Sequence, residues 1–530
     1  MRKTAAAVAV GSLFAFAAVA FSHEDNNAAD TGGKLGKVNF QNSCSPKVQQ
    51  KLQRGVAMLH SFWWPAGEQA FQEIAAEDPN CVVAAWGFLS ILMYNPFVGI
   101  VPPQDVARAQ AAIEKGRQMG AKTQREKDYL EAAAAYWEDF ANRSERQRAL
   151  ARSKAYEALA AKYPKDDEAQ IFNALYLIPI QERSDQTYKD VLKAAAILEK
   201  QFAKHPNHPG VAHYLIHAYD APPIAQKGLS SAKRYASIAP AAPHAQHMPS
   251  HIFTRVGAWQ ESAASNRRSA EAAVKTKEGD DALHALDYVV YAYLQLARDT
   301  EARKTVDEAM SITGHTPRFI APYALAAMPA RLAVERGAWR EAAQLQPVQT
   351  KYPFVDAVYH QARALGAARI GDAAAAKADL AQIERRRDAL REAKNDYWAT
   401  EVEVMRLSAA AWTSLAEGKN EEALGLMRAA ADMEDKNEKH PVTPGRILPA
   451  REMLGDMLME LKAPADALKE YEQSQKREPG RFRGLYGAAL AAEMAGDAKA
   501  ARRYYARLVQ IAGKGEPRAE LTLARTYLGQ

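Results

Sequence analysis

A 34-residue period restricts the fold of this chain more than any other feature. The stretch LGDMLMELKAPADALKEYEQSQKREPG is followed by AALAAEMAGDAKAARRYYARLVQIAGK, and the two align at a spacing of 34, with Ala467 opposite Ala501 and Tyr471 opposite Tyr505. A repeat of this length holds two helices that cannot bury their apolar faces alone and must stack on neighbouring units. The period therefore predicts an all-α chain.

A G-x-x-x-x-A marker and regularly placed prolines identify the kind of unit. They occur at Gly337/Ala342, Gly371/Ala376, Gly418/Ala423 and Gly496/Ala501, and at Pro79, Pro164, Pro206 and Pro479. Small residues let two helices cross closely, and proline stops the second helix. The pattern resembles the tetratricopeptide repeat, which implies an α-solenoid of about a dozen tetratricopeptide-like helical hairpins over residues 45–530. We expect helix in more than two-thirds of the mature chain and no β-sheet.

The N-terminal residues have the pattern of a secretory signal. Two cations follow the first methionine, and an apolar run over residues 5–21 ends in small residues that suit signal peptidase. We expect residues 1–22 to be a signal peptide, residues 23–44 to be a flexible segment, and the protein to be periplasmic or secreted. No later run reaches the roughly 18 apolar residues of a membrane span, so we expect no membrane span once the signal is removed.

The chain has two cysteines, Cys44 and Cys81. Each directly precedes the first helix of a unit, and equivalent positions of adjacent solenoid units are neighbours. In an exported protein, a pair placed in this way most simply forms a disulfide that pins the first unit. The alternative is a buried Cys81 and a free Cys44.

Two HxxxH pairs lie in the histidine-rich central units, at about residues 205–295. HPGVAHYLIHAYD contains His213 and His217, and HAQHMPSHIFTRVG contains His247 and His251, each one 34 residues after its counterpart. Residues four apart share one face of a helix, and packed helices lie about 9 Å apart. We therefore expect these four imidazoles to converge on one ion.

Three further residues extend the expected site. Counting back from the glycine of the following turn puts His244, His247 and His251 at the second, fifth and ninth places of a unit's first helix. The next unit has His284 and Asp287 at the second and fifth places. In the tetratricopeptide family these places line the concave ligand groove. We expect His244, His284 and Asp287 to be further ligands, or to fix the tautomers of the other imidazoles through hydrogen bonds.

The register of the second histidine unit has one alternative. If Pro243 ends the preceding unit, the unit shifts by three residues. The two equal spacings of 34 residues between the HxxxH pairs argue against that shift.

Three interpretations of this site are open. Imidazole-rich sites suit a transition metal such as copper, zinc or iron and suit magnesium or calcium poorly. Histidine in a tetratricopeptide groove can also grip a peptide, so the second interpretation is a periplasmic scaffold that binds a peptide or protein partner. The third is a metal-dependent enzyme, which needs an open coordination position. Ordinary packing of core histidines is a further alternative, but neither packing nor a peptide groove explains two HxxxH pairs in phase with the repeat.

Other sequence signals are weak. GxSxG, HExxH, CxxC, Walker and GxGxxG motifs are absent, and a net charge of +6 over 530 residues gives no nucleic-acid footprint. The two histidine stretches, HALDYVVYAYLQ and LHSFWW resemble a group of large exported bacterial tetratricopeptide repeat proteins. The resemblance covers most of the chain and implies its fold, but it implies no reaction.

The metal interpretation predicts how metal affinity depends on pH and on the histidines outside the cluster. A neutral imidazole is the ligand and its ordinary pKa is about 6.5, so metal affinity should decrease below about pH 6. Three histidines outside the cluster, His60, His315 and His440, should contribute little.

Overall fold

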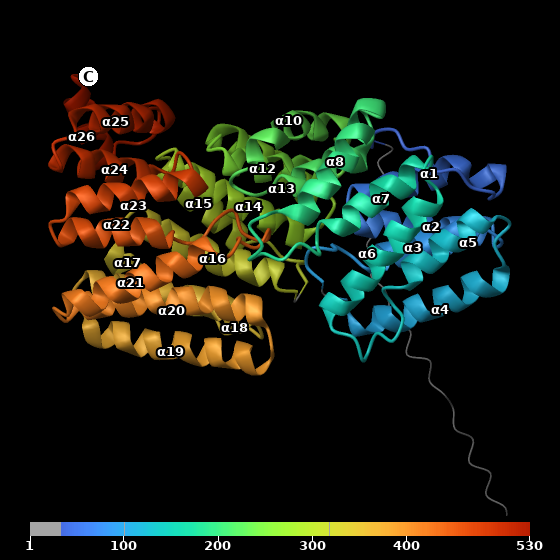
Figure 1. Cartoon of the computed structure of the whole chain (residues 1–530), viewed down its shortest axis with the longest axis horizontal. Coiled ribbons are helices and arrows are strands. Elements are labelled where there is room, and N and C mark those ends of the chain that lie inside the picture. The colour runs from blue at the N-terminus through green and yellow to red at the C-terminus, as the bar shows by residue number, and fades with distance from the viewer. Residues whose placement is uncertain (1–32, 100, 317) are drawn as a thin grey trace, which may run out of the picture.

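A computed structural model describes residues 33–99, 101–316 and 318–530 (Figure 1). The predicted signal peptide and the first part of the predicted flexible segment lie outside the described residues. Helices account for 71% of the described part of the chain, which contains no β-strand. The prediction of an all-α chain with more than two-thirds helix is therefore confirmed.

The helices up to the histidine-rich units run as follows. They are η1 (Pro46–Val48), α1 (Gln49–His60), α2 (Trp64–Glu77), α3 (Val82–Leu92), α4 (Pro103–Met119), α5 (Gln124–Ala134), α6 (Glu145–Lys162), α7 (Asp167–Leu177), α8 (Lys189–Lys204), α9 (Pro209–Ala218), η2 (Ala225–Gly228), α10 (Leu229–Ile238), α11 (Pro243–His247), α12 (Pro249–Arg255), α13 (Trp259–Lys275) and α14 (Gly279–Gln295).

The remaining helices lead to the C-terminus. They are α15 (Asp299–Met310), α16 (Ile320–Glu335), α17 (Trp339–Ala343), α18 (Pro353–Arg369), α19 (Ala373–Glu392), α20 (Asp396–Ala416), α21 (Asn420–Asp435), α22 (Ala450–Glu460), α23 (Pro464–Arg477), α24 (Phe482–Met494), α25 (Ala498–Ala512) and α26 (Ala519–Leu528). Figure 1 shows the N-terminal helices at one end of the molecule and the C-terminal helices at the other.

Consecutive helices pack as antiparallel hairpins, and the first helices of successive hairpins pack side by side. In the C-terminal half these inner helices are α14, α16, α18, α20, α22 and α24. Both kinds of contact are those of a helical-repeat array, in which each unit contacts its neighbours. The predicted α-solenoid is thus the observed architecture.

The solenoid curls tightly enough to enclose its own inner face. Helix α1 packs against α9, and α14 packs against α24. The Trp259 indole donates a hydrogen bond to the Gly480 carbonyl at 2.7 Å, and Arg481 donates to the Tyr291 hydroxyl at 2.5 Å. Residues 436–449 form a loop that is mostly buried inside this curl. The groove that we expected to be open and concave is therefore a closed interior, because helices far apart in the sequence, α1 with α9 and α14 with α24, pack against each other.

Helix starts in the histidine-rich units follow the predicted register. Proline is the first residue of both α9 and α11, which puts His213 and His247 at the fifth place of their helices. Helix α12 begins at Pro249, with Met248 between it and α11, so His251 occupies the ninth place across a short break in the helix. Pro243 therefore begins a unit and does not end one. Helix α14 begins about one turn earlier than expected, at Gly279.

The described part of the predicted flexible segment, residues 33–44, is packed against the helices. It has no regular secondary structure, but Leu35 and Phe40 are buried. The Phe40 ring stacks on Trp86 with 4.5 Å between centroids. The expectation of flexibility is wrong for these residues, because two apolar side chains anchor a stretch that reads as polar.

Cys44 and Cys81 form the expected disulfide, with their Cα atoms 4.9 Å apart. The bond closes a loop with a sequence separation of 37 residues. By the chain-entropy estimate, such a loop raises the free energy of unfolding by about 3 to 4 kcal/mol. No helix in the described ranges is long and apolar enough to cross a membrane.

Candidate metal centre

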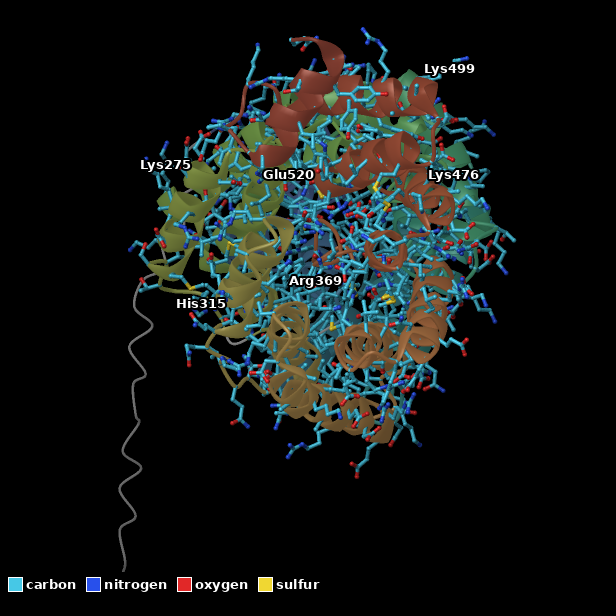
Figure 2. The ribbon with its side chains drawn as sticks, turned by 90° about the vertical axis from the view of Figure 1, so that its left-hand side faces the viewer. Lys275, His315, Arg369, Lys476, Lys499 and Glu520 are labelled. Atoms are coloured by element: carbon cyan, nitrogen blue, oxygen red, sulfur yellow. A yellow bond between two sulfur atoms is a disulfide. The ribbon has the colours of Figure 1, made fainter. Side chains whose placement is uncertain are left out.

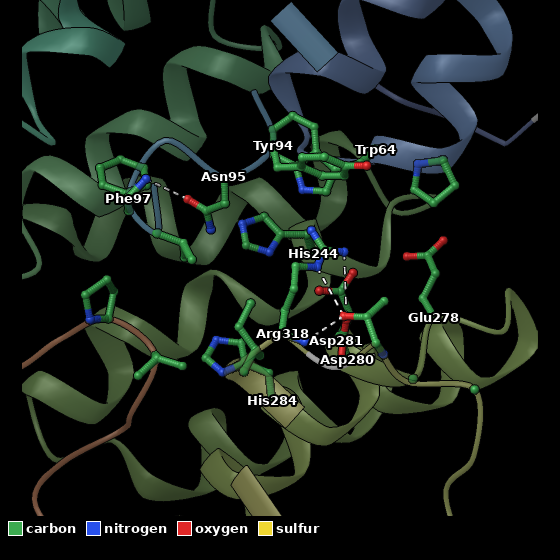
Figure 3. Close-up of a pocket in the computed structure, with 18 of the residues that line it drawn as sticks. Trp64, Tyr94, Asn95, Phe97, His244, Glu278, Asp280, Asp281, His284 and Arg318 are labelled. Atoms are coloured by element: carbon green, nitrogen blue, oxygen red, sulfur yellow. Dashed lines mark hydrogen bonds and ion pairs between the residues drawn. The ribbon is translucent and has the colours of Figure 1, made fainter. Parts of the chain in front are cut away.

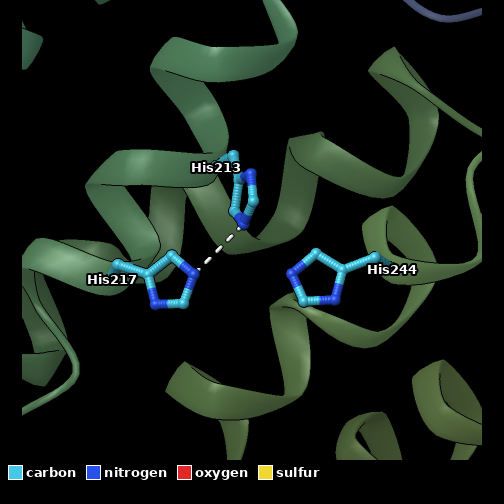
Figure 4. Close-up of side chains that lie close together, drawn as sticks. All are labelled: His213, His217 and His244. Atoms are coloured by element: carbon cyan, nitrogen blue, oxygen red, sulfur yellow. Dashed lines mark hydrogen bonds between the residues drawn. The ribbon is translucent and has the colours of Figure 1, made fainter. Parts of the chain in front are cut away.

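The six predicted histidines come together in two groups of three. The first triad is His213, His217 and His244, and the second triad is His247, His251 and His284. Within each triad, one ligand atom from every residue lies within 4.8 Å of the others. Figure 4 shows the three rings of the first triad pointing toward a common centre.

The second triad repeats the first, one unit later in the solenoid. Each takes the fifth and ninth residues counted from the first proline of a unit, which are His213 and His217 in the first triad and His247 and His251 in the second. Each takes its third histidine from near the start of the next inner helix. The 34-residue phase therefore places two equivalent triads side by side, where we expected one site with four central ligands.

In the first triad, the His213 ring is fixed by a backbone carbonyl. Its Nδ1 lies 2.7 Å from the His60 carbonyl oxygen, which can only accept, so Nδ1 carries the proton. The Nε2 of neutral His213 therefore presents a lone pair. His217 Nε2 lies 3.1 Å from His213 Nε2.

In the second triad, an asparagine fixes the His247 ring. His247 Nδ1 lies 2.7 Å from Asn266 Oδ1, while the amide nitrogen of Asn266 donates to the Ser262 carbonyl at 2.8 Å. The second bond sets the orientation of the amide, so Oδ1 is the acceptor and His247 Nδ1 is the donor. The Nε2 of neutral His247 is again a lone pair.

A carboxylate fixes the His251 ring. His251 Nδ1 lies 2.9 Å from Asp220 Oδ2, and Arg255 donates to the other carboxylate oxygen at 2.8 Å. The nearby Lys439 and Arg255 hold the pKa of Asp220 well below its usual range against the opposing effect of burial. Asp220 is therefore ionised and accepts a hydrogen bond from the N–H at His251 Nδ1, which leaves a lone pair on His251 Nε2.

The two lone pairs of the second triad face each other. His247 Nε2 and His251 Nε2 are 2.9 Å apart, and both rings are fixed with their proton on Nδ1. Two lone pairs at this distance repel unless a cation or a proton lies between them. Burial lowers the pKa of both imidazoles, so a proton is disfavoured there. A metal cation bound by both nitrogens turns this repulsive contact into a favourable one.

The nitrogen separations also suit a metal. At a metal–nitrogen distance of about 2.1 Å, two nitrogens 2.9–3.1 Å apart subtend about 90° at the ion. Tetrahedral coordination needs about 3.4 Å, which small ring rotations supply. Hydrogen bonds from Nδ1 to a carbonyl, an amide oxygen and a carboxylate are the outer contacts that metal-bound histidines usually make.

The third histidine of each triad has an unused nitrogen. Among the described residues, His244 Nε2 and His284 Nδ1 are buried without a hydrogen-bond partner. An unsatisfied buried ring nitrogen is unfavourable in an ordinary core. Burial lowers the pKa of both side chains well below the usual value, so they stay neutral and able to bind a metal.

A cavity of about 310 Å³ opens onto both triads (Figure 3). Its histidines are His217 and His244 from the first triad and His251 and His284 from the second. Its other walls include the aromatic and charged residues Trp64, Tyr94, Phe97, Lys277, Glu278, Asp280, Asp281 and Arg318. Sequence reasoning did not find this wall, because it comes from loops and helix starts outside the repeat pattern.

Asp287 is not part of either triad. Its Oδ1 lies 3.4 Å from Nε of Arg331, and both side chains are fully buried. Burial raises the pKa of Asp287 to about 6 despite the arginine beside it. The expectation that Asp287 joins the histidines is wrong, because an arginine two helices along in the sequence takes its carboxylate.

His60 was expected to be unrelated to the cluster, yet it lies beside it. Its carbonyl accepts from His213, and its own ring belongs to a third buried group with Glu168 and His208. The side chains of His315 and His440 lie elsewhere, as expected. His315 is exposed and lies at the edge of the molecule in Figure 2, and His440 stacks on Trp398 with 5.2 Å between centroids.

Sequence reasoning also missed the residues that fix the imidazoles. Asp220 ends the quoted stretch HPGVAHYLIHAYD, three residues after His217, so its position was a usable signal. Asn266 lies in the outer helix α13 and the His60 carbonyl in α1, and neither has a motif that marks it.

Comparisons with known proteins place the chain in no family. No family model matches it, and no curated protein matches it. Similar solved structures include the APC/C hetero-tetramer Cut9–Hcn1, at 11% identity and a TM-score of 0.32, covering 90% of this chain and 96% of that one. The human IFIT1 dimer with m7Gppp-AAAA is 11% identical at a TM-score of 0.37, covering 82% and 90%.

Proposed function

We propose that the protein binds two transition-metal ions, one in each histidine triad. The observation that carries the proposal is the 2.9 Å contact between Nε2 of His247 and Nε2 of His251, whose Nδ1 protons are both committed elsewhere. Only a positive charge between these nitrogens makes the contact favourable. The triad one unit away supplies the same arrangement of residues, which argues for a second ion.

Copper, zinc or iron are the metals that fit best. Both triads consist of imidazoles, which suit these ions and not magnesium or calcium. Three protein ligands leave at least one coordination position of each ion open, as in catalytic zinc sites. A metal-dependent enzyme is therefore the more specific form of the proposal, and a protein that stores or carries metal is the simpler form.

The scaffold alternative has less support. A peptide-binding groove needs an accessible inner face, but His213, His217, His247 and His251 are each 8% exposed or less. Phe97 stacks on His217 with 4.0 Å between centroids and covers part of that face. A peptide could reach the mouth of the 310 Å³ cavity without reaching the deeper histidines.

We also propose that the protein works outside the cytoplasm, in the periplasm or as a secreted protein. The signal-like N-terminus supports this location, and so does the Cys44–Cys81 disulfide, which persists in oxidising compartments. Fractionation of cells that express the full chain, with a thiol count on the exported product, tests this point. Two free thiols in protein recovered from its native compartment would contradict it.

Metal titration of protein stripped by a chelator tests the main proposal. We expect two equivalents of Zn²⁺ or Cu²⁺ to bind the wild type and one to bind the double variant His247→Ala/His251→Ala. The control is His315→Ala, which changes an exposed histidine and should leave two. Binding of no metal, or equal loss in the control, would contradict the proposal. Circular dichroism of each variant verifies that its helices remain.

A further inference from the structure

We infer that the two ions form one dinuclear centre that binds a small bridging anion, such as azide, inside the cavity. This inference rests on the proposed function and adds a ligand to it. Its three supports are the closeness of the triads, the cavity that they share and the charge that the ions bring.

The two triads are close enough for their ions to interact. The ring centroids of His217 and His251 are 5.8 Å apart, and those of His244 and His247 are also 5.8 Å apart. A metal lies about 3 Å from the centroid of an imidazole that binds it. The two ions are therefore at most about 12 Å apart even if they lie on opposite sides of these rings, and closer if both face the cavity.

The open coordination positions of both ions face the same space. Each triad contributes two histidines to the wall of the 310 Å³ cavity. The remaining histidine, His213 in the first triad and His247 in the second, does not line the cavity and lies deeper. The deep rings are held by the His60 carbonyl and by Asn266. Because four of the six histidines lie in the wall of one cavity, a ligand from solution that enters this cavity can reach both ions.

The side chains around the triads do not offset the positive charge of two metal ions, which favours the binding of an anion. Six neutral imidazoles do not offset two divalent cations, and the hydrogen-bonded carboxylate, Asp220, already faces Arg255 and Lys439 at 2.8 and 3.9 Å. On the opposite wall, Asp280 is held by Arg318 and Thr316, and Glu278 accepts from the Trp63 indole. Burial and the neighbouring Glu278 raise the pKa of Asp281, a further carboxyl of this wall, well above its usual range, which reduces the negative charge there. A buried pair of cations without an anion is unfavourable. A small anion that bridges the ions offsets their charge.

Electron paramagnetic resonance of copper-loaded protein tests whether the two ions share a centre. In wild-type protein with two equivalents of Cu²⁺, the signal of isolated ions should be lost, since neighbouring unpaired electrons couple. The variants His213→Ala/His217→Ala and His247→Ala/His251→Ala, each with one equivalent, should show the ordinary signal of a single ion. Should a double variant fail to fold, the single changes His244→Ala and His284→Ala replace it.

Azide is the probe for the bridging ligand. It should bind the doubly loaded wild type at least about tenfold more tightly than either singly loaded variant, because attachment to two ions adds to the affinity. An additive spectrum of two isolated Cu²⁺ ions, or equal azide affinity in all three proteins, would overturn the inference. The proposed function would survive either result, since it fails only if the triads bind no metal.

Discussion

Two buried histidine clusters lie side by side in this protein: the group of His60, Glu168 and His208, and the pair of histidine triads. They differ in whether their ring nitrogens have hydrogen-bond partners. In the group of His60, Glu168 and His208, every ring nitrogen has a partner. His60 contacts the Tyr214 hydroxyl at 2.9 Å and Glu168 at 3.0 Å, and His208 contacts Glu168 at 3.0 Å and the Val211 backbone N–H at 3.3 Å. In the neighbouring triads, lone pairs face each other or have no partner among the described residues.

The difference shows which property of a buried histidine indicates a metal. Both clusters are buried and both bring three candidate ligands within 4.8 Å. Glu168 takes the N–H groups of two imidazoles and is held ionised by them, so that cluster is a closed hydrogen-bond network. The triads contain acceptors with no donor to meet them. Unsatisfied lone pairs, and not proximity alone, therefore separate a candidate metal site from a structural cluster.

The largest expected effect comes from breaking the satisfied cluster. Replacing Glu168 by glutamine keeps an acceptor for one imidazole but puts an amide N–H₂ against the N–H of the other, in a fully buried place. We expect the free energy of unfolding to decrease by about 3 to 5 kcal/mol, the usual result of removing one partner from a buried charged network. Urea denaturation of metal-free protein measures it, while metal titration should still give two equivalents.

Glu421→Gln is the matched control for this change. Glu421 is exposed on α21, and its replacement should alter the free energy of unfolding by no more than about 0.5 kcal/mol. If Glu168→Gln were equally harmless, or if it removed a bound ion, the division between a structural cluster and a metal centre would be wrong.

The next effect concerns the residue that orients His247. Asn266→Ala removes the acceptor of the Nδ1 proton, so the ring can turn and present either nitrogen. We expect the affinity of the second triad for Zn²⁺ to decrease by about 10- to 100-fold, as for other outer contacts of metal ligands. Competition with a chromophoric chelator measures this, and the first triad should bind as before.

Asn142→Ala is the control for that titration, because Asn142 is exposed in another part of the chain. Unchanged affinity in Asn266→Ala would mean that packing alone orients His247. An equal loss in both triads would mean that the ions cannot bind independently.

The repeat period predicted the fold and the spacing of the histidines correctly because both depend on local geometry. Pro209 and Pro243 start their helices, so the fifth and ninth places followed from counting. The pairing into two triads did not follow, because it depends on how far one inner helix is shifted along the next. Asp287 shows the same limit, since its partner Arg331 is 44 residues away in the sequence.

Acid sensitivity provides a third comparison of the clusters. Burial lowers the pKa of five triad histidines well below 6.5 and that of the sixth, His251, in the same direction. An unfolded chain takes up these protons near pH 6.5, whereas the folded protein does so only at lower pH. The free energy of unfolding should therefore decrease as pH decreases below about 6.5, by up to about 1.4 kcal/mol per pH unit for each histidine.

Urea titrations of metal-free protein between pH 5.5 and 7.5 test this sign. His284→Ala removes one such group and should make the dependence shallower by up to about 1.4 kcal/mol per pH unit. Glu168→Gln should not make the dependence shallower, because burial lowers the pKa of His60 and loss of the Glu168 carboxylate, which raises that pKa, lowers it further. Equal slopes in wild type and His284→Ala would show that this histidine titrates normally. The lowered pKa values also mean that proton competition with metal begins at a lower pH than the value of about 6 expected from the sequence.

The smallest effect gives the most exact comparison, because it changes one hydroxyl in the satisfied cluster. Tyr214→Phe leaves His60 Nδ1 without its partner at 2.9 Å but keeps the Tyr214 ring in place. We expect the free energy of unfolding to decrease by about 1 kcal/mol, as for the loss of one buried hydrogen bond. The metal affinity of both triads should stay within about twofold of wild type, because His213 is held by the backbone carbonyl of His60 and not by its ring. A tenfold lower metal affinity of the first triad in this variant would show that the orientation of the His60 ring affects the position of its carbonyl. The two clusters would then act as a single network.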